Sequence, residues 1–198
     1  MLHQMNGAPL PVNHGYPARI IAPGIAGARC VKWLTKIIVQ GCESQNFYQQ
    51  RDYKILPPEA INREVAEEYW DKVPAMLDMP INSVIAVPQS GEIVTLDEKG
   101  EMVVRGYALP QGESGPVVQV EVSSDGGDTW SDAVIESEKK KWCWVLWSKR
   151  VKMEKGEGRR LLCRATDTGG NVQPASPEWN LRGVGYNGYG DARDLKII

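Results

Sequence analysis

The chain has 198 residues, 42% of them hydrophobic, and its 23 Lys and Arg residues nearly balance 25 Asp and Glu residues, for a formal net charge of −2. This composition excludes disordered and fibrous classes and suits one large or two small globular domains. The balanced charge gives no broad positive field, so we expect no nucleic-acid partner. No apolar run reaches the roughly 20 residues of a membrane helix, and no signal peptide is evident, so we expect a soluble chain without membrane contact.

The first part of the chain predicts loops that connect short strands. Residues 1–13 are rich in proline, glycine and asparagine, which is typical of a loop. Two runs with many β-branched residues follow, RII at 19–21 and VKWLTKIIVQ at 31–40, and both are candidate strands. The basic residues of this region are therefore expected on loops between strands.

A helical pattern follows in the run PPEAINREVAEEYWDKVPAM. Three large apolar residues, Ile61, Val65 and Tyr69, recur at a spacing of four residues. Pro74 ends the pattern, because proline cannot continue a helix. The spacing predicts one short amphipathic helix before a linker, and we place the boundary between two domains, 1–79 and 80–198, just after it.

The second part of the chain predicts an antiparallel β-sandwich. Its short alternating runs are separated by turn clusters such as SSDGGDTW and TDTGGN, and they cover 83–88, 92–96, 102–109, 117–125, 142–152 and 159–167. Val118, Val120 and Val122 alternate with polar residues, so they should share a buried face.

The run WCWVLW is apolar on both faces of its predicted strand. Trp142, Trp144 and Leu146 should form one face, and Cys143, Val145 and Trp147 the other. Because an antiparallel sheet usually leaves one face to solvent, the second apolar face indicates contact with another domain or subunit. A central strand with local cover is the alternative. The four cysteines contain no CxxC pair and are expected to be free thiols.

A histidine and two cations lie close together near the start of the chain. His14, Arg19 and Lys32 fall on loop-like backbone whose glycines allow a phosphate or another oxyanion to approach closely. Arginine can bind such a group with two hydrogen bonds and lysine as a point charge. The alternative is that the cations are solvated strand ends and the histidine a turn residue.

The string around these residues resembles one known family. MNGAPLPVNHGYPARIIAPGIAGARCVKWLTKI is similar to a segment of the eukaryotic-type sulfite oxidase family, which also includes the assimilatory nitrate reductases. The similarity continues in ESQNFYQQRDYKILPP, VEVSSDGGDTW, KWCWVLW and NVQPASPEWNLRG. It implies a mainly β chain, in which residues 1–79 form the C-terminal part of an α+β molybdopterin-binding domain. Residues 80–198 would form an immunoglobulin-like dimerisation domain.

The resemblance also implies site residues. His14, Arg19 and the run Cys30, Val31 and Lys32 match residues that bind the molybdenum-molybdopterin cofactor, while Tyr53 and Arg182 match the catalytic, substrate-binding tyrosine and arginine. The chemistry agrees, because sulfite or sulfate needs cationic donors and a phenol can donate or relay a proton. These two positions also favour sulfite over nitrate, since nitrate reductases lack both residues.

The function implied is oxidation of sulfite to sulfate by oxygen-atom transfer at a molybdopterin centre. The family's metal-ligating cysteine lies in a half of the fold that is missing here, so we expect no metal ligand in this chain, which should be the C-terminal portion of a longer enzyme. A homodimer, an external electron acceptor (cytochrome c or oxygen) and no heme domain are also implied. The mitochondrial intermembrane space is the expected location, with peroxisome or cytoplasm as alternatives.

Two other functions stay open. Because the metal ligand is missing, the chain could be a non-catalytic dimerisation module, and a nitrate-reducing relative is the third reading. The last residues, GVGYNGYGDARDLKII, also depart from the family's usual tail, which makes the last strand of the sandwich the least predictable element.

Overall fold

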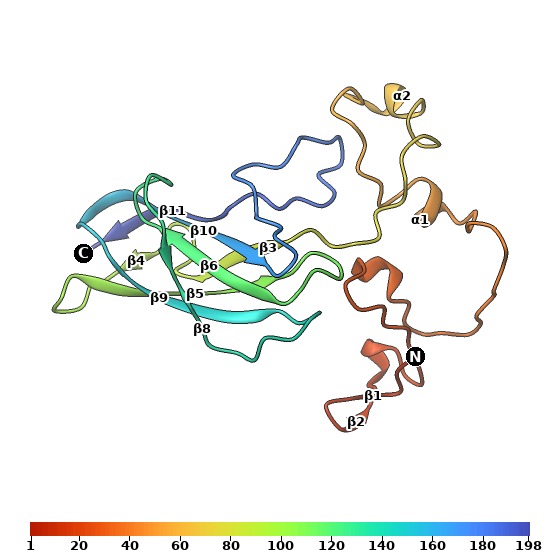
Figure 1. The fold of residues 1–198 in the computed structure, drawn as a ribbon, viewed down its shortest axis with the longest axis horizontal. Coiled ribbons are helices and arrows are strands. Elements are labelled where there is room, and N and C mark those ends of the chain that lie inside the picture. The colour runs from red at the N-terminus through yellow and green to blue at the C-terminus, as the bar shows by residue number, and fades with distance from the viewer. The chain divides into compact units, whose positions relative to one another are not determined.

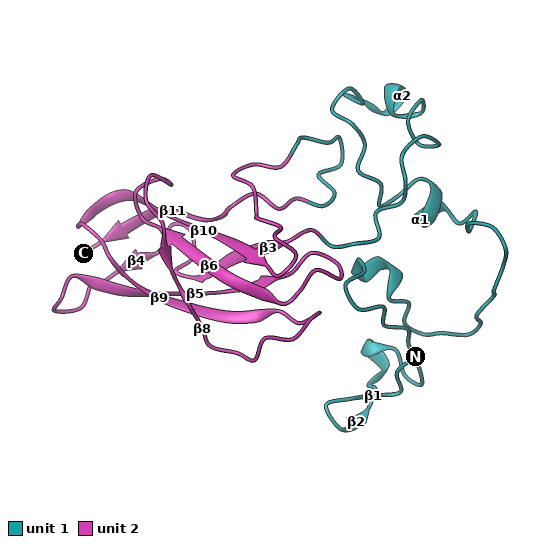
Figure 2. Ribbon diagram, viewed as in Figure 1, with its two compact units in different colours: residues 1–79, 178–185 teal, residues 80–177, 186–198 magenta.

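The computed structural model describes residues 1–198, which form two compact units (Figures 1 and 2). The first unit comprises residues 1–79 together with 178–185, and the second comprises residues 80–177 and 186–198. The chain therefore leaves the second unit for one short excursion before it returns. No helix in the structure has the length and apolar character needed to cross a membrane.

The second unit consists of two largely antiparallel sheets, and this confirms the predicted mainly β fold (Figure 1). Its strands are β3 (Asn82–Val87), β4 (Ile93–Val94), β5 (Glu101–Leu109), β6 (Val117–Ser123), β7 (Ser131–Asp132), β8 (Val134–Ile135), β9 (Val145–Lys152), β10 (Gly156–Asp167) and β11 (Gly190–Ile197). One sheet has the order β4-β11-β10-β6-β7 and the other β3-β5-β9-β8. Only the β4–β11 pair is parallel.

The hydrophobic core of the second unit draws on both sheets. Val104 and Trp147 enter it from the four-stranded sheet, and Val120, Leu161 and Leu195 enter it from the five-stranded sheet; none of the five is more than 1% exposed. Along β5 the buried residues alternate with more exposed ones, as the sequence pattern predicts. Burial of these apolar side chains is the main term that stabilises the unit.

The prediction that Val118 shares the buried face of β6 is wrong. Val120 and Val122 are buried, whereas Val118 is exposed and Val117 is buried instead. The pairing with β10 shows the cause, because its register shifts between Thr166 and Asp167, where β6 carries one extra residue. Such a bulge reverses the side-chain alternation beyond it.

The strand predicted over 142–152 begins only at Val145. Val145 and Trp147 share one face, as predicted, and this face lies in the core, but Cys143 precedes the strand and is exposed. On the opposite face Trp144 and Leu146 are exposed. The ring of Trp144 meets that of Tyr107 edge-on, with 5.0 Å between ring centroids.

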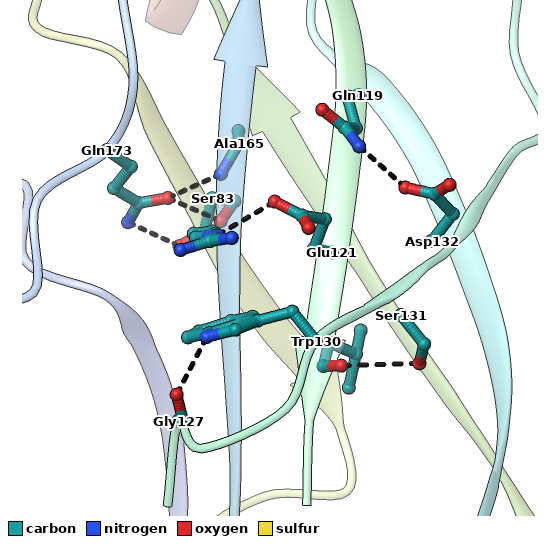
Figure 3. Close-up of polar contacts among 11 residues, drawn as sticks. Ser83, Gln119, Glu121, Gly127, Trp130, Ser131, Asp132, Ala165 and Gln173 are labelled. Carbon is teal, nitrogen blue, oxygen red and sulfur yellow. Dashed lines mark hydrogen bonds and ion pairs between the residues drawn. The ribbon is translucent and has the colours of Figure 1, made fainter.

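A buried polar cluster links β3 and β10 to the loop after β10 (Figure 3). The side-chain carbonyl of Gln173 accepts hydrogen bonds from the Ser83 hydroxyl (2.5 Å) and the Ala165 amide (3.2 Å). The NH₂ group of Gln173 donates to the Gly188 carbonyl (2.6 Å). The Cys163 thiol lies 3.2 Å from the same hydroxyl. Burial raises the pKa of this thiol to about 12, so it stays protonated at neutral pH.

The first unit contains little regular structure. Its elements are β1 (Gln4–Met5), β2 (Ala8–Pro9), η1 (Val12–His14), η2 (Gly27–Arg29), α1 (Phe47–Gln50) and α2 (Arg63–Ala66). The strands predicted at 19–21 and 31–40 are wrong, since the former contributes one isolated bridge and the latter nothing. Trp33, at a φ of 57°, interrupts the second run in the left-handed region, and the run has no neighbouring strand with which to form a ladder.

The predicted amphipathic helix is only partly confirmed. It shortens to α2, because the Asn62 side chain accepts a hydrogen bond from the Val65 amide and starts the helix at Arg63. Ile61 precedes this start and is 66% exposed, so it cannot lie on a buried helical face. The residues that are buried here are Ala66 and Trp70, with Leu56 and Ala60 from the preceding turn.

Candidate cofactor and oxyanion site

The structure brings His14, Arg19 and Lys32 together around one glycine. Gly15 has a φ of 107°, which suits glycine far better than other residues. A Cβ at this position would lie 2.7 Å from the Lys32 Cβ and 3.3 Å from the Arg19 Cβ. Glycine is therefore required for the two cationic residues to approach this turn so closely.

The cations at this turn are held by backbone carbonyls rather than carboxylates. The Arg19 guanidinium donates to the carbonyls of His14 and Cys30, each at 3.1 Å, and the Lys32 ammonium donates to the Asn13 carbonyl at 2.9 Å. The Arg19 Nε is buried and has no hydrogen-bond partner. Residues 1–42 contain no Asp or Glu. Because no acid neutralises these cations, the turn can attract an anion.

The other residues of the predicted cofactor run have different surroundings. Cys30 is half-buried, and its sulfur accepts a hydrogen bond from the Ala22 amide at 3.4 Å. The side chain of Val31 is exposed, while its carbonyl accepts from the Ile20 amide at 2.8 Å. The backbone of this run therefore pairs with the segment that follows Arg19.

Tyr53 lies in a strained turn of the first unit. Its φ of 46° is in the left-handed region, which is uncommon for an aromatic residue. Its carbonyl accepts a hydrogen bond from the Met76 amide at 2.7 Å. The side chain borders a cavity of about 540 Å³ that is also lined by Arg29, Asn46 and Gln49. The sequence reveals none of this backbone strain.

Arg182 lies in a turn shaped by Asn180. The Asn180 side-chain carbonyl accepts hydrogen bonds from the amides of Arg182 (3.3 Å) and Val184 (3.0 Å). The Arg182 guanidinium forms an ion pair with Asp52, whose side chain is only 13% exposed. This carboxylate is the residue immediately before Tyr53, so the pair links the two predicted substrate residues.

Arg182 and Tyr53 line different cavities. Arg182 and Asp52 border a larger cavity, of about 690 Å³, with Trp70 in its wall, and Tyr53 borders the smaller one. Asp52 lines the first cavity and its neighbour Tyr53 lines the second.

Two further arginines line the larger cavity and were not predicted as site residues. Arg51 forms an ion pair with Glu67, whereas Arg63 has no acidic partner. The sequence could have pointed to Arg51 as a site residue, since it is the first residue of the RDY motif that contains Tyr53. No local pattern marks Arg63. The structure shows no group of three His, Cys, Asp or Glu side chains that could hold a metal ion.

Family models match both parts of the chain. Residues 73–191 match the Mo-co oxidoreductase dimerisation domain, and residues 1–48 match the oxidoreductase molybdopterin binding domain. The dimerisation match covers most of the β-sandwich. The molybdopterin-binding match contains the turn of His14, Arg19 and Lys32.

Similar proteins include oxidases and a reductase. Human mitochondrial sulfite oxidase (Homo sapiens) is 40% identical over 196 residues, covering 96% of this chain and 35% of the human protein. Barley nitrate reductase (Hordeum vulgare) is 36% identical over 200 residues, covering 94% of this chain and 22% of the reductase. The crystal structure of the sulfane dehydrogenase SoxCD from Paracoccus pantotrophus matches 99% of this chain and 50% of that one, with a TM-score of 0.75 and 24% identity, which shows the fold.

The sandwich and the basic turn before it define the class of molecule: a dimerisation domain of molybdenum-cofactor oxidoreductases preceded by part of a molybdopterin-binding domain. The chain belongs to the sulfite oxidase family, as its sequence indicates. It spans about a third of the length of the human relative.

Proposed function

We propose that the chain takes part in the oxidation of sulfite to sulfate, with the first unit binding molybdopterin and a sulfite oxyanion. The observation that supports this most strongly is the turn around Gly15. It presents two cations without a carboxylate partner and a buried Arg19 Nε without any partner. A buried N–H group without a partner is costly, and a bound anionic group would offset that cost.

These residues fit the anionic side of the cofactor. Arg19 and Lys32 would bind its phosphate, His14 would contact the pterin, and Cys30 and Val31 would contribute main-chain contacts. Bound molybdenum-molybdopterin supplies the oxygen-atom transfer. The chain's own part is to hold the cofactor and orient the oxyanion, and we assign no metal ligand to it. The proposal includes the two domain ranges: residues 1–79 as part of the molybdopterin-binding domain and residues 80–198 as the dimerisation domain.

The substrate side of the site rests on Arg182 and Tyr53. Arg182 carries a positive charge on a partly exposed side chain, which suits an oxyanion that arrives from solvent. Tyr53 offers a phenol that can donate a hydrogen bond or relay a proton. An external acceptor, cytochrome c or oxygen, would take the electrons. The human relative's name supports a mitochondrial location, and a peroxisomal one is the alternative.

Cofactor binding is tested by the molybdenum content of the purified chain. Expressed in a host that makes molybdopterin, the chain is expected to carry close to one molybdenum per protein. Arg19→Gln and Lys32→Gln should lower this ratio, because each removes a charge-assisted contact to phosphate. Arg193→Gln, which changes an exposed arginine of the sandwich, is the matched control and should keep the ratio.

A ratio near zero in a folded chain would overturn cofactor binding by this chain alone. It would favour the second candidate function, a non-catalytic dimerisation module. Turnover of nitrate without turnover of sulfite would instead favour the reductase branch, to which the barley relative belongs.

We also propose that the sandwich forms a homodimer through the outer face of its four-stranded sheet. Tyr107, Trp144 and Leu146 form an apolar patch there, with Tyr107 paired to Leu146 across β5 and β9. Trp144 is 64% exposed and Leu146 58% exposed. An exposed aromatic patch on a sheet indicates an interface, and two copies of the chain offer identical patches to each other.

The double substitution Trp144→Ser and Leu146→Lys is expected to produce a monomer. It removes the two exposed apolar side chains of the patch, and it places one lysine on each copy, so that two like charges would meet in the dimer. Light scattering at micromolar concentration measures the mass. Val118→Lys, which alters an exposed valine of the other sheet, should leave a dimer. A monomeric wild-type chain, or a double variant that stays dimeric, would count against this interface.

A further inference from the structure

One short segment supports both parts of the proposed site. Residues 76–79 run beside the backbone between Arg19 and Lys32. The Ala26 amide donates to the Leu77 carbonyl (2.7 Å), the Met79 amide donates to the Gly24 carbonyl (3.1 Å), and Ile25 bridges Asp78. The segment is thus attached directly to the backbone that carries the cofactor-binding cations.

The first residue of this segment, Met76, also lies against the backbone of Tyr53 and against Gly185, in the loop that carries Arg182. Its amide donates to the carbonyl of Tyr53 at 2.7 Å. Its sulfur packs against Gly185, three residues after Arg182, where an added Cβ would lie 3.5 Å from the sulfur. Met76 therefore lies where the backbones of the cofactor turn, Tyr53 and the Arg182 loop converge.

Arg29 fixes this junction. Its Nε donates to the Met76 carbonyl at 3.1 Å, and its Nη1 donates to the Gln49 side chain in α1. Both backbone polar groups of Met76 are then held, the carbonyl by Arg29 and the amide by the Tyr53 carbonyl. Arg29 makes no ion pair with any carboxylate, and its Nη2 is buried without a partner. A charged donor that satisfies a single backbone carbonyl in this way is a strong structural tie.

The backbone of Tyr53 needs to be held in place by such a hydrogen bond. A non-glycine residue in the left-handed region is strained, and it persists only where its surroundings hold it there. We propose that Arg29 is a positioning residue that, through Met76, fixes Tyr53 and the loop of Arg182 relative to the cofactor turn. This inference rests on the proposed function of those residues, although the geometry of the junction does not.

Amide hydrogen exchange tests the positioning itself, without cofactor or activity. In the 198-residue chain followed by NMR, Arg29→Gln is expected to speed exchange of the Met76 amide about tenfold, as loss of a charge-assisted bond predicts. Arg29→Lys keeps one donor for the Met76 carbonyl and should restore part of the protection. Arg193→Gln is the control and should change nothing at Met76.

Unchanged exchange at Met76 in Arg29→Gln would overturn the proposal. So would equal acceleration at the Val65 amide, which the Asn62 side chain protects in α2, because that would show general loosening of the unit. Acceleration at Met76 with an unchanged Val65 amide supports it.

Sulfate binding then separates this inference from the proposed function. Calorimetry with sulfate as the probe is expected to show about tenfold weaker binding in Arg29→Gln, with the affinity partly restored in Arg29→Lys. No sulfate binding by the wild-type chain would count against the proposed function, while the exchange result would still decide the role of Arg29. Weaker binding with unchanged Met76 exchange would show direct contact between Arg29 and the anion, and would overturn positioning.

Discussion

Replacing Gly106 with alanine is expected to destabilise the β-sandwich by at least about 3 kcal/mol, the upper range for overpacking a core. Gly106 lies in β5, between β3 and β9. An added Cβ would stand 2.0 Å from the Val84 carbonyl oxygen and 2.4 Å from the Trp147 ring. The first neighbour is backbone in a paired strand and the second is a fully buried indole, so neither can move aside.

The measurement is the free energy of unfolding from denaturant titration. Gly126→Ala is the matched control, because a Cβ added to this glycine would meet nothing within 4 Å, although its φ is 83°. It should cost only about 1–2 kcal/mol, the strain of a left-handed residue. Similar losses in the two variants would mean that the contact of Gly106 with Trp147 and β3 is looser than the structure shows.

If Arg182 binds the oxyanion as proposed, Arg182→Gln is expected to raise the Michaelis constant for sulfite by on the order of a hundredfold in a sulfite-oxidising enzyme that contains this chain, since it deletes a charged partner. The structure adds a second effect. Asp52 loses its cation, and its carboxylate is largely buried. The substitution should therefore also lower the stability of the first unit, because a buried charge without a partner is unfavourable.

Two companion variants separate these effects. Arg182→Lys keeps the charge but not the planar guanidinium, so it should recover part of the affinity. Asp52→Asn frees Arg182 from its ion pair and should change the Michaelis constant less than Arg182→Gln does. Unchanged kinetics in Arg182→Gln would remove Arg182 from the substrate site.

The sandwich could largely be predicted because alternation of apolar residues is a local signal. β5 follows it throughout, whereas β10 follows it only in its second half, after the three consecutive buried residues 161–163. β11 does not, since its buried residues Ala192, Leu195 and Ile197 are unevenly spaced, and its pairing with β10 contains register shifts. The bulge at Val118 was equally invisible, because it arises from pairing with another strand.

The first unit was harder to predict because its structure also depends on contacts between residues that are far apart in the sequence. The similarity of the HGYPAR and RCVKW motifs to the family gave the cationic turn, and the structure does bring Arg19 and Lys32 together. The motif similarity could not reveal the ion pair of Asp52 with Arg182, because these two residues are far apart in the sequence. The β-branched run at 31–40 also misled, because composition alone cannot show whether a strand has a neighbour.

Because residues 178–185 belong to the first unit, the two units cannot be separated by cutting the chain at one position. Three chain crossings join them, after residues 79, 177 and 185. A gene fusion or truncation at residue 79 would leave the first unit without the turn that carries Arg182. To transplant the sandwich alone, a short linker would have to replace residues 178–185 and join Pro177 to Tyr186. The hydrogen bond from the Gln173 side chain to the Gly188 carbonyl already holds the two flanking segments near each other. Modular exchange of this sandwich between proteins would therefore transfer the turn of Arg182, and with it part of the proposed substrate site.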